Sequence, residues 1–108
     1  MTARSVQGYE GIAVAVPVTI PSERRTEHGV QWWLGRVLDG LCQESGIAKQ
    51  EIDGLIVASY TLRPDNAVSM SEYFDLNLRW LEDLHMGGAT GPIALRRAAR
   101  AVQAGDAE

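Results

Sequence analysis

Apolar runs at two places in the chain predict strands. Residues 11–20 (GIAVAVPVTI) are a β-branched apolar run, which is typical of a buried strand, and Pro17 in this run favours an edge or a bend. Residues 52–60 (IDGLIVASY) form a second run that is apolar on both faces at its centre. We therefore expect this second strand to be covered on both sides of the sheet.

The clearest helix is predicted between these two runs. From about residue 27 to residue 45, apolar residues recur at three- and four-residue steps, the spacing of an amphipathic helix. They are Val30, Trp33, Leu34, Val37, Leu38, Leu41 and Cys42. Gly46 is a natural stop for this helix, and residues 47–51 are expected to be a linker.

A short helix is predicted after the second strand. Residues 61–68 contain Arg, Pro, Asp and Asn and have the composition of a turn-rich loop. Residues 69–76 are then expected to be helical, because Ser69 and Glu72 have the spacing of a capping box.

The last part of the chain predicts one more helix. Residues 77–86 read as irregular or extended chain, and the helix is expected to open at Thr90 or Gly91. Pro92 suits its first turn, and Gly105 is expected to terminate it.

Strands alternating with helices predict an α/β fold with a mostly parallel sheet flanked by helices. A central strand is expected after the last helix, and residues 101–108 only close that helix. We therefore expect a truncated piece of a larger α/β protein, or one half of a split one, with an incomplete sheet. Residues 1–10 are expected to be an entry segment, and residues 11–108 a partial domain.

Composition narrows the function classes. The chain has 108 residues and a net charge of −4, which argues against a general nucleic-acid binder. It has no apolar run of membrane-spanning length and no secretory signal, so we expect a cytoplasmic protein without a membrane span. The single cysteine, Cys42, gives neither a disulfide framework nor a metal quartet. We therefore expect no metal site.

The most informative stretch is residues 84–92 (LHMGGATGP), which leads into the alanine-rich segment that ends at Gly105. It predicts an extended segment that turns through glycines into a helix with small side chains. Such a turn directs backbone N–H groups and the positive end of the helix at one point. The pattern is suited to holding a nucleophile, an oxyanion or an anionic ligand.

Three segments together resemble the N-terminal part of a thiolase, most closely the lipid-transfer-protein or sterol-carrier-protein type. They are residues 51–57 (EIDGLIV), 69–76 (SMSEYFDL) and 87–91 (GGATG), the last leading into residues 98–107 (AARAVQAGDA). The resemblance implies a partial thiolase-like fold and an acyl-coenzyme A substrate, with no covalently bound cofactor. It also implies carbon–carbon bond chemistry in lipid metabolism or steroid degradation, as an acyltransferase or a retro-aldolase (a lyase). A homodimer, or a complex with an OB-fold subunit, is implied as well.

The chain departs from the family at the nucleophile. Typical thiolases carry a Cys-Ala-Ser-Gly-like string here, and the matching string is Gly88-Ala89-Thr90-Gly91. Because Gly88 has no side chain, covalent acyl transfer from this position is impossible. A retro-aldol reaction needs a base and stabilisation of an enolate, and does not need the cysteine.

Six neighbouring residues are the candidate site: His85 and Gly88 as catalytic residues, and Met86, Gly87, Ala89 and Thr90 as substrate-binding residues. Four of them also have a plainer interpretation. The glycines can form an ordinary tight turn, and His85 can be a strand-end histidine satisfied by neighbours or exposed to water. Thr90 can cap the helix by accepting a backbone N–H.

Four other residues have competing interpretations. Arg96, Arg97 and Arg100 share one side of the last helix and could meet the phosphates of coenzyme A. A solvated face, or salt bridges to another subunit, is the alternative. Cys42 lies on the apolar stripe without a histidine at matching spacing, so we interpret it as a core residue.

The aromatic residues are interpreted as core or interface anchors. Trp33 falls on the apolar stripe of the predicted helix, and Trp80 is a further anchor elsewhere in the chain. Trp32 lies off the stripe and is therefore the better candidate for contact with a partner. Residues 63–66 and Tyr73 fall where thiolase-like proteins form dimer contacts and pocket walls.

The sequence leaves three hypotheses open. The first is a segment of a thiolase-like enzyme that acts on an acyl-coenzyme A, with acid and base supplied from outside this chain, so that the chain alone is inactive. The second is a non-catalytic or split thiolase-like subunit that completes its sheet with a partner. The third is an unrelated α/β domain whose glycine turn only imitates the family.

Overall fold

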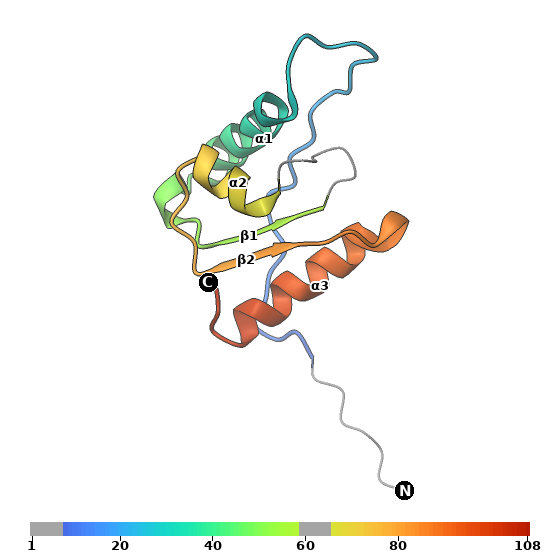
Figure 1. The fold of residues 1–108 in the computed structure, drawn as a ribbon. Helices are drawn as coiled ribbons and strands as arrows, with labels where there is room; N and C mark the ends of the chain where they lie inside the picture. Colours follow the sequence, from blue (N-terminus) through green and yellow to red (C-terminus); the bar gives the residue numbers. More distant parts are fainter. Residues whose placement is uncertain (1–7, 59–65) are drawn as a thin grey trace, which may run out of the picture.

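The computed structural model of the chain describes residues 8–58 and 66–108. Within these residues it is a small α/β fold with three α-helices and a two-stranded parallel sheet (Figure 1). In chain order the elements are α1 (Val30–Ser45), the 3-10 helix η1 (Lys49–Glu51), β1 (Gly54–Val57), α2 (Ala67–Tyr73), β2 (Trp80–Asp83), the 3-10 helix η2 (Gly87–Ala89) and α3 (Thr90–Gln103).

The two strands pair in parallel, with Gly54 beside Trp80 and Val57 beside Asp83. Parallel neighbours need a crossover connection, which contains α2. Helices α1 and α2 lie over one face of the sheet and α3 lies under the other (Figure 1). The expectation that the strand within residues 52–60 is covered on both sides is confirmed, because β1 contacts both α2 and α3.

Alternation along β2 assigns its side chains to the two faces of the sheet. Leu81 packs against the core cluster on the α2 side, and the carboxylate of Asp83 accepts the backbone N–H of Ala67 at 2.8 Å. Trp80 and Glu82 instead line a pocket beside α3. The Asp83 bond ties the first residue of α2 to the end of β2.

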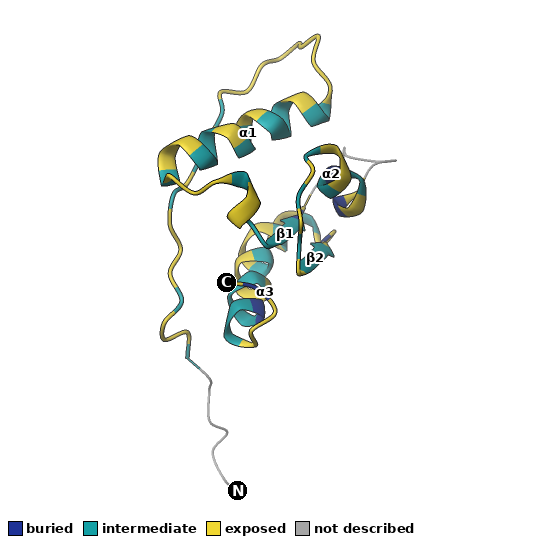
Figure 2. Cartoon of the chain, turned by 90° about the vertical axis from the view of Figure 1, so that its left-hand side faces the viewer, coloured by how far each residue is buried: buried dark blue, intermediate teal, exposed yellow. Residues whose placement is uncertain are grey.

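One cluster of buried residues lies on α2 and the sheet. It consists of Val57, Ala67 and Met70, with partly buried neighbours packed around them. Leu84, Ala101 and Ala107 are buried outside this cluster. Helix α1, although it has 16 residues, has no buried residue. Figure 2 shows this difference, since α1 carries intermediate and exposed colours throughout while α2 and α3 carry buried positions.

An apolar cavity of about 410 Å³ lies under α1, so the apolar side chains of this helix are not fully buried. It lies between α1, α2 and β1, and every side chain that lines it is apolar: Val30, Leu34, Val37, Leu38, Leu41, Leu55, Ile56, Val57, Ala58, Met70, Phe74 and Leu76. The apolar stripe of α1 therefore faces the sheet as its spacing predicts, but it does not close onto it.

The predicted limits of α1 are close to the observed ones. The helix begins at Val30, three residues after the expected start, and ends at Ser45. Gly46 adopts a left-handed conformation with φ of 73°, and its N–H donates to the carbonyl of Cys42 at 3.0 Å. The expected stop is confirmed, since this backbone angle suits glycine.

The start of α2 differs from the prediction. Asn66 is the capping residue: its side-chain oxygen accepts the N–H of Ser69 at 3.0 Å, and the Ser69 hydroxyl accepts the N–H of Asn66 at 2.8 Å. Ser69 is therefore the third residue of the helix, and a capping box of Ser69 with Glu72 is wrong. Residues 61–65 of the expected loop lie outside the described residues.

The prediction of a strand at residues 11–20 is also wrong for this structure. The segment has no ladder partner; a turn bond joins the N–H of Ile12 to the carbonyl of Tyr9 at 3.0 Å, and Val14 is 79% exposed. Val16 interrupts the extended chain with φ of 57°. Apolar, β-branched composition favours a strand, but a strand also requires a neighbour to accept its backbone bonds.

Two other expectations change in detail. Within the described part of the second predicted strand, residues 52–58, the regular strand is β1, while residues 59 and 60 lie outside the described residues. Residues 77–86 contain the regular strand β2. Helix α3 ends at Gln103 and Gly105 follows with φ of 81°, as a terminator should.

Asp53 ties the end of the chain to the amino end of β1. Its carboxylate accepts the N–H of Glu108 at 3.1 and 3.2 Å and pairs with Arg79 at 3.4 Å. Arg79 also donates to the carbonyl of Gly105 at 2.7 Å. The far end of α3 therefore lies at the amino edge of the sheet, and its first residues lie at the carboxyl edge.

Candidate functional site

The glycine turn connects the carboxyl end of β2 to α3. After the strand, Leu84 is buried and donates its N–H to the carbonyl of Val57 at 2.9 Å, which extends the parallel pairing by one residue. The chain then forms η2, in which Gly87 has φ of 64°, and enters α3 at Thr90. The predicted sequence of extended chain, glycine turn and helix is confirmed.

The backbone at Gly88 is open to solvent. A Cβ atom placed on Gly88 would meet no atom within 4 Å outside its immediate chain neighbours. The first N–H groups of a helical turn have no carbonyl within that turn to bond to, and at η2 these belong to Gly87 and Gly88. An oxygen atom of a ligand can therefore approach this backbone, near the positive end of α3.

The Thr90 hydroxyl holds the turn closed. It accepts the N–H of Met86 at 3.0 Å and donates to the carbonyl of Gly87 at 2.6 Å. Thr90 thus accepts a backbone N–H as expected, but from a residue before the helix. It does not cap α3, whose N-cap residue is Ala89 and which has no side-chain cap. The hydroxyl positions the glycine turn.

The remaining candidates are placed around this turn. His85, Met86 and Ala89 are exposed, Met86 to 55%. The turn therefore presents one side that is mostly open, rather than an enclosed pocket. The chemistry available at the turn is backbone hydrogen bonding, with the imidazole of His85 as a neighbouring side chain that can donate or accept a hydrogen bond.

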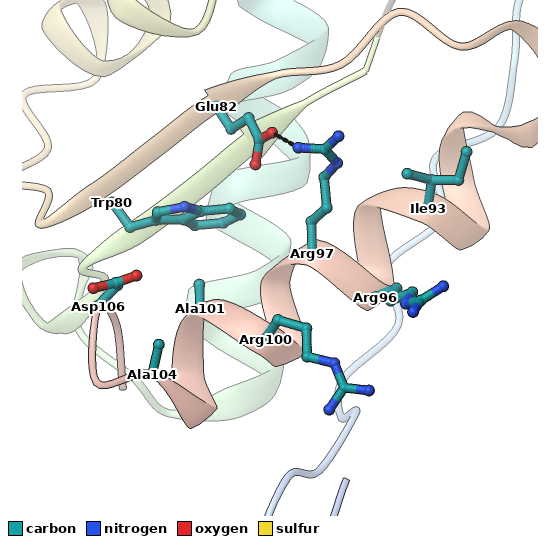
Figure 3. Close-up of a pocket in the computed structure, with 9 residues that line it drawn as sticks. All are labelled: Trp80, Glu82, Ile93, Arg96, Arg97, Arg100, Ala101, Ala104 and Asp106. Carbon is teal, nitrogen blue, oxygen red and sulfur yellow. Dashed lines mark hydrogen bonds and ion pairs between the residues drawn. The ribbon is translucent and has the colours of Figure 1, made fainter. Parts of the chain in front are cut away.

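A separate open pocket of about 560 Å³ lies beside α3 (Figure 3). Residues of β2 and of α3 and the chain after it line it: Trp80, Glu82, Ile93, Arg96, Arg97, Arg100, Ala101, Ala104 and Asp106. The prediction that the three arginines share one side of the helix is confirmed. The sequence did not indicate that Trp80 and Glu82 would face them, because β2 was expected only as irregular or extended chain.

Two of these arginines are engaged within the chain. Arg97 forms an ion pair with Glu82, which joins α3 to β2. Arg100 donates to the carbonyl of Gly8 at 3.1 Å and to the side chain of Gln103 at 2.6 Å, and it lies 4.0 Å from the ring centre of Tyr9. These contacts give Arg97 and Arg100 structural roles, whereas Arg96 is exposed on the rim.

The aromatic residues at the start of α1 form their own cluster. His28 stacks on Trp32 with ring centres 3.5 Å apart, and Trp32 meets Trp33 edge to face at 4.8 Å. Arg36 lies 5.2 Å from the Trp32 ring centre. Trp32, the expected partner contact, is 38% exposed.

Other sequence candidates lie apart from the glycine turn. Cys42 is half-buried on α1, and Tyr73 on α2 is 64% exposed. Of residues 63–66, only Asn66 is described, and it caps α2.

Within residues 8–58 and 66–108, no group of three or more His, Cys, Asp or Glu side chains is arranged to hold a metal ion. The same residues include no helix that is both long and apolar enough to cross a bilayer.

Comparison with protein-family models, curated proteins and solved structures found no match to this chain.

Proposed function

We propose that this chain is the N-terminal part of a thiolase-like protein of the lipid-transfer type, and that its glycine turn binds the thioester carbonyl of an acyl-coenzyme A. The observation that carries the proposal is the open backbone at Gly88, at the end of a parallel strand and the start of a helix. In α/β sheets ligands bind at the carboxyl ends of the strands. The resemblance of residues 51–57, 69–76 and 87–91 to thiolases selects the ligand class.

The chemistry proposed for this turn is stabilisation of negative charge on oxygen. In a retro-aldol reaction a base removes the proton of a β-hydroxyl, the bond between Cα and Cβ breaks, and the electron pair moves onto the thioester oxygen as an enolate. The N–H groups of Gly87 and Gly88 would donate hydrogen bonds to that oxygen. A base and an acid come from other segments, so the chain alone is inactive. Within this chain, His85 is the candidate acid or base that lies nearest to the turn.

The wider setting of this proposal follows the family. The complete protein acts in lipid or steroid breakdown in the cytoplasm, as a homodimer or together with an OB-fold subunit. Residues 11–108 form part of one domain in this view. No covalently bound cofactor is proposed, and the coenzyme A thioester is the substrate.

A second candidate function is favoured by α1. A 16-residue helix with no buried residue, above an apolar cavity, is the expected state of a subunit that completes its fold with a partner chain. In this alternative the chain is a non-catalytic or split thiolase-like subunit, and the glycine turn is structural.

Calorimetric titration with acetyl-coenzyme A separates the two candidates. Gly88→Leu fills the open space above the turn, whereas Gly91→Leu adds the same side chain one turn later, also where an added Cβ meets nothing within 4 Å. We expect the unchanged chain and Gly91→Leu to bind, and Gly88→Leu to lose about tenfold or more in affinity, as expected for one or two lost hydrogen bonds.

Circular dichroism of all three proteins checks that the helices are retained. Equal affinity in the three proteins would show that the ligand binds elsewhere, and absence of binding to the unchanged chain would favour the structural subunit.

A further inference from the structure

The open pocket beside α3 is lined by cationic, aromatic and anionic side chains in order along the helix (Figure 3). Arg96 and Arg97 lie toward the start of α3, Trp80 and Ala101 lie beyond them, and Asp106 lies at the opposite end. Its volume of about 560 Å³ is within the range of small-molecule sites, about 300–1,000 Å³. The lining shares no residue with the glycine turn, so the pocket is a second candidate site.

The end of the pocket near the start of α3 is positively charged. Arg96 is exposed on the rim, and the side chain of Arg97 is 51% exposed although its Nη1 donates to Glu82. A guanidinium carries five N–H donors, so this ion pair leaves donors of Arg97 for a second acceptor. Arg100 adds a third positive charge on the same side of the helix. Neighbouring arginines of this kind are suited to a phosphate group.

The middle of the pocket has an aromatic wall. The indole of Trp80 is half-buried, and its Cε3 atom would lie 3.2 Å from a Cβ on Gly54, so the neighbouring strand holds the ring in place. Helix α3 contributes only the methyl groups of Ala101 and Ala104 to this part of the pocket. Because these side chains are small, the space beside the indole stays open to a planar ring, and bases of nucleotides bind to aromatic side chains in this way.

The opposite end of the pocket carries a carboxylate. Asp106 follows α3, and its backbone N–H donates to the carbonyl of Ala101 at 2.9 Å, which fixes the position of the residue. Its side chain is exposed and lines the pocket beside Trp80 (Figure 3). An ionised carboxylate only accepts hydrogen bonds, so it favours a ligand group that donates. The exocyclic amino group of a nucleotide base is such a donor.

We propose that this pocket binds a mononucleotide whose base carries an amino group. The phosphate lies at Arg96 and Arg97, the base lies against Trp80, and the amino group donates to Asp106. A nucleotide presents its phosphate, ring and amino group in the same order as the pocket presents their partners. Free adenosine monophosphate and the adenosine phosphate end of coenzyme A share this chemistry. The site does not depend on the function proposed for the glycine turn.

Calorimetric titration of the unchanged chain with adenosine monophosphate tests this proposal. Adenosine lacks the phosphate, ribose phosphate lacks the base, and inosine monophosphate has a carbonyl oxygen in place of the amino group. We expect saturable binding of adenosine monophosphate, and affinities lower by about tenfold or more for each of the other three compounds. Absence of saturable binding would overturn the proposal, and so would equal affinities for adenosine monophosphate and inosine monophosphate.

A matched pair of arginine variants tests the phosphate end. Arg96 and Arg24 are both exposed, but Arg24 lies in the connection before α1 and does not line the pocket. We expect Arg96→Ala to weaken binding of adenosine monophosphate by about tenfold, and Arg24→Ala to leave it within about twofold. Equal affinities in the two variants would contradict the placement of the phosphate. Circular dichroism checks that α3 is retained in Arg96→Ala.

Asp106→Ala tests the other end of the pocket. The variant removes the carboxylate and leaves the backbone bond to Ala101 in place. We expect it to bind adenosine monophosphate and inosine monophosphate with affinities within about twofold of each other, because the acceptor for the amino group is gone. A preference as large as that of the unchanged chain would overturn the role of Asp106.

Competition with acetyl-coenzyme A identifies the source of the nucleotide. Displacement of adenosine monophosphate from both the unchanged chain and Gly88→Leu would assign the pocket to the adenosine end of coenzyme A. Simultaneous binding of the two ligands would assign it to a free nucleotide. Because adenosine monophosphate has no thioester, a chain that binds it but not acetyl-coenzyme A would support the pocket and contradict the function proposed for the glycine turn. The reverse result would overturn the pocket alone.

Discussion

Two units, one near each end of the described chain, consist of a segment that leads into a helix, and only the C-terminal segment is paired in the sheet. In the C-terminal unit, β2 pairs with β1, turns at Gly87 and enters α3, which buries Ala101. In the N-terminal unit, residues 11–20 pair with nothing and lead through a longer connection to α1, which buries no residue.

The difference shows what the neighbours of a segment contribute. Hydrogen bonds and an ion pair anchor the C-terminal unit at both ends. Asp83 accepts the N–H of Ala67, and Asp53 pairs with Arg79 and accepts the N–H of Glu108. The N-terminal unit has contacts at Gly8 and Val18 but no ladder. The N-terminal unit therefore lacks a paired strand because of where its segment lies, and not because of its composition.

The largest expected effect tests whether the stability of the chain resides in the completed part. Met70 is 2% exposed at the centre of the core cluster, and Val68 on the same helix is 51% exposed. We expect Met70→Ala to lower the free energy of unfolding by about 2–5 kcal/mol, and Val68→Ala to change it by about 0.5 kcal/mol. Denaturant titration followed by circular dichroism measures both.

A cost for Met70→Ala no larger than that for Val68→Ala would show that the cluster is not the core of the folded chain.

The next effect concerns the close packing of the completed unit. A Cβ on Gly54 would lie 3.2 Å from atoms of both Ala107 and Trp80, while one on Gly88 meets nothing within 4 Å. We expect Gly54→Ala to destabilise the chain by about 1–3 kcal/mol, because backbone and side chains must shift. Gly88→Ala should stay within about 0.5 kcal/mol of the unchanged chain. Thermal unfolding of the two variants compares them, and equal midpoints would contradict the packing of Ala107 on β1.

The smallest effects concern the helix starts. Helix α2 is capped by the side chain of Asn66, whereas the N-cap residue of α1 is Gly29, which offers no side chain for a cap. We expect Asn66→Ala to lower the free energy of unfolding by about 1 kcal/mol, and Gly29→Asn to raise it by a few tenths, roughly 0.3 kcal/mol. Denaturant midpoints measured in parallel give the sign of each change in the free energy of unfolding. A higher free energy of unfolding for Asn66→Ala would show that the Asn66 cap contributes nothing to stability.

Local patterns predicted the elements that depend on neighbouring residues in the chain. The stripe of α1, its stop at Gly46 and the glycine turn before α3 are set by spacing, backbone angle and helix chemistry, so they could be read from the sequence. The start of α2 was missed by a few residues because Asn66 forms with Ser69 the box that was assigned to Ser69 with Glu72.

Features that depend on distant residues could not be predicted in this way. The strand at residues 11–20 was predicted from its composition, but pairing depends on which edge is within reach. Trp80 and Glu82 face the α3 arginines because alternate side chains of β2 point to the α3 side of the sheet. No pattern in the sequence near β2 indicates which of its side chains point to that side. The six candidate site residues were found together because they are adjacent in sequence, and only the structure assigns the Thr90 hydroxyl to the closure of the turn.

The central claim is that the glycine turn before α3 receives the oxygen of an acyl-coenzyme A. Titration of the ¹⁵N-labelled chain with acetyl-coenzyme A, followed at each backbone amide, tests it most directly. The account predicts that the amide resonances of Gly87 and Gly88 shift more than all others and saturate together. Saturable shifts that leave these two amides unmoved, or no shifts at any concentration, would contradict it.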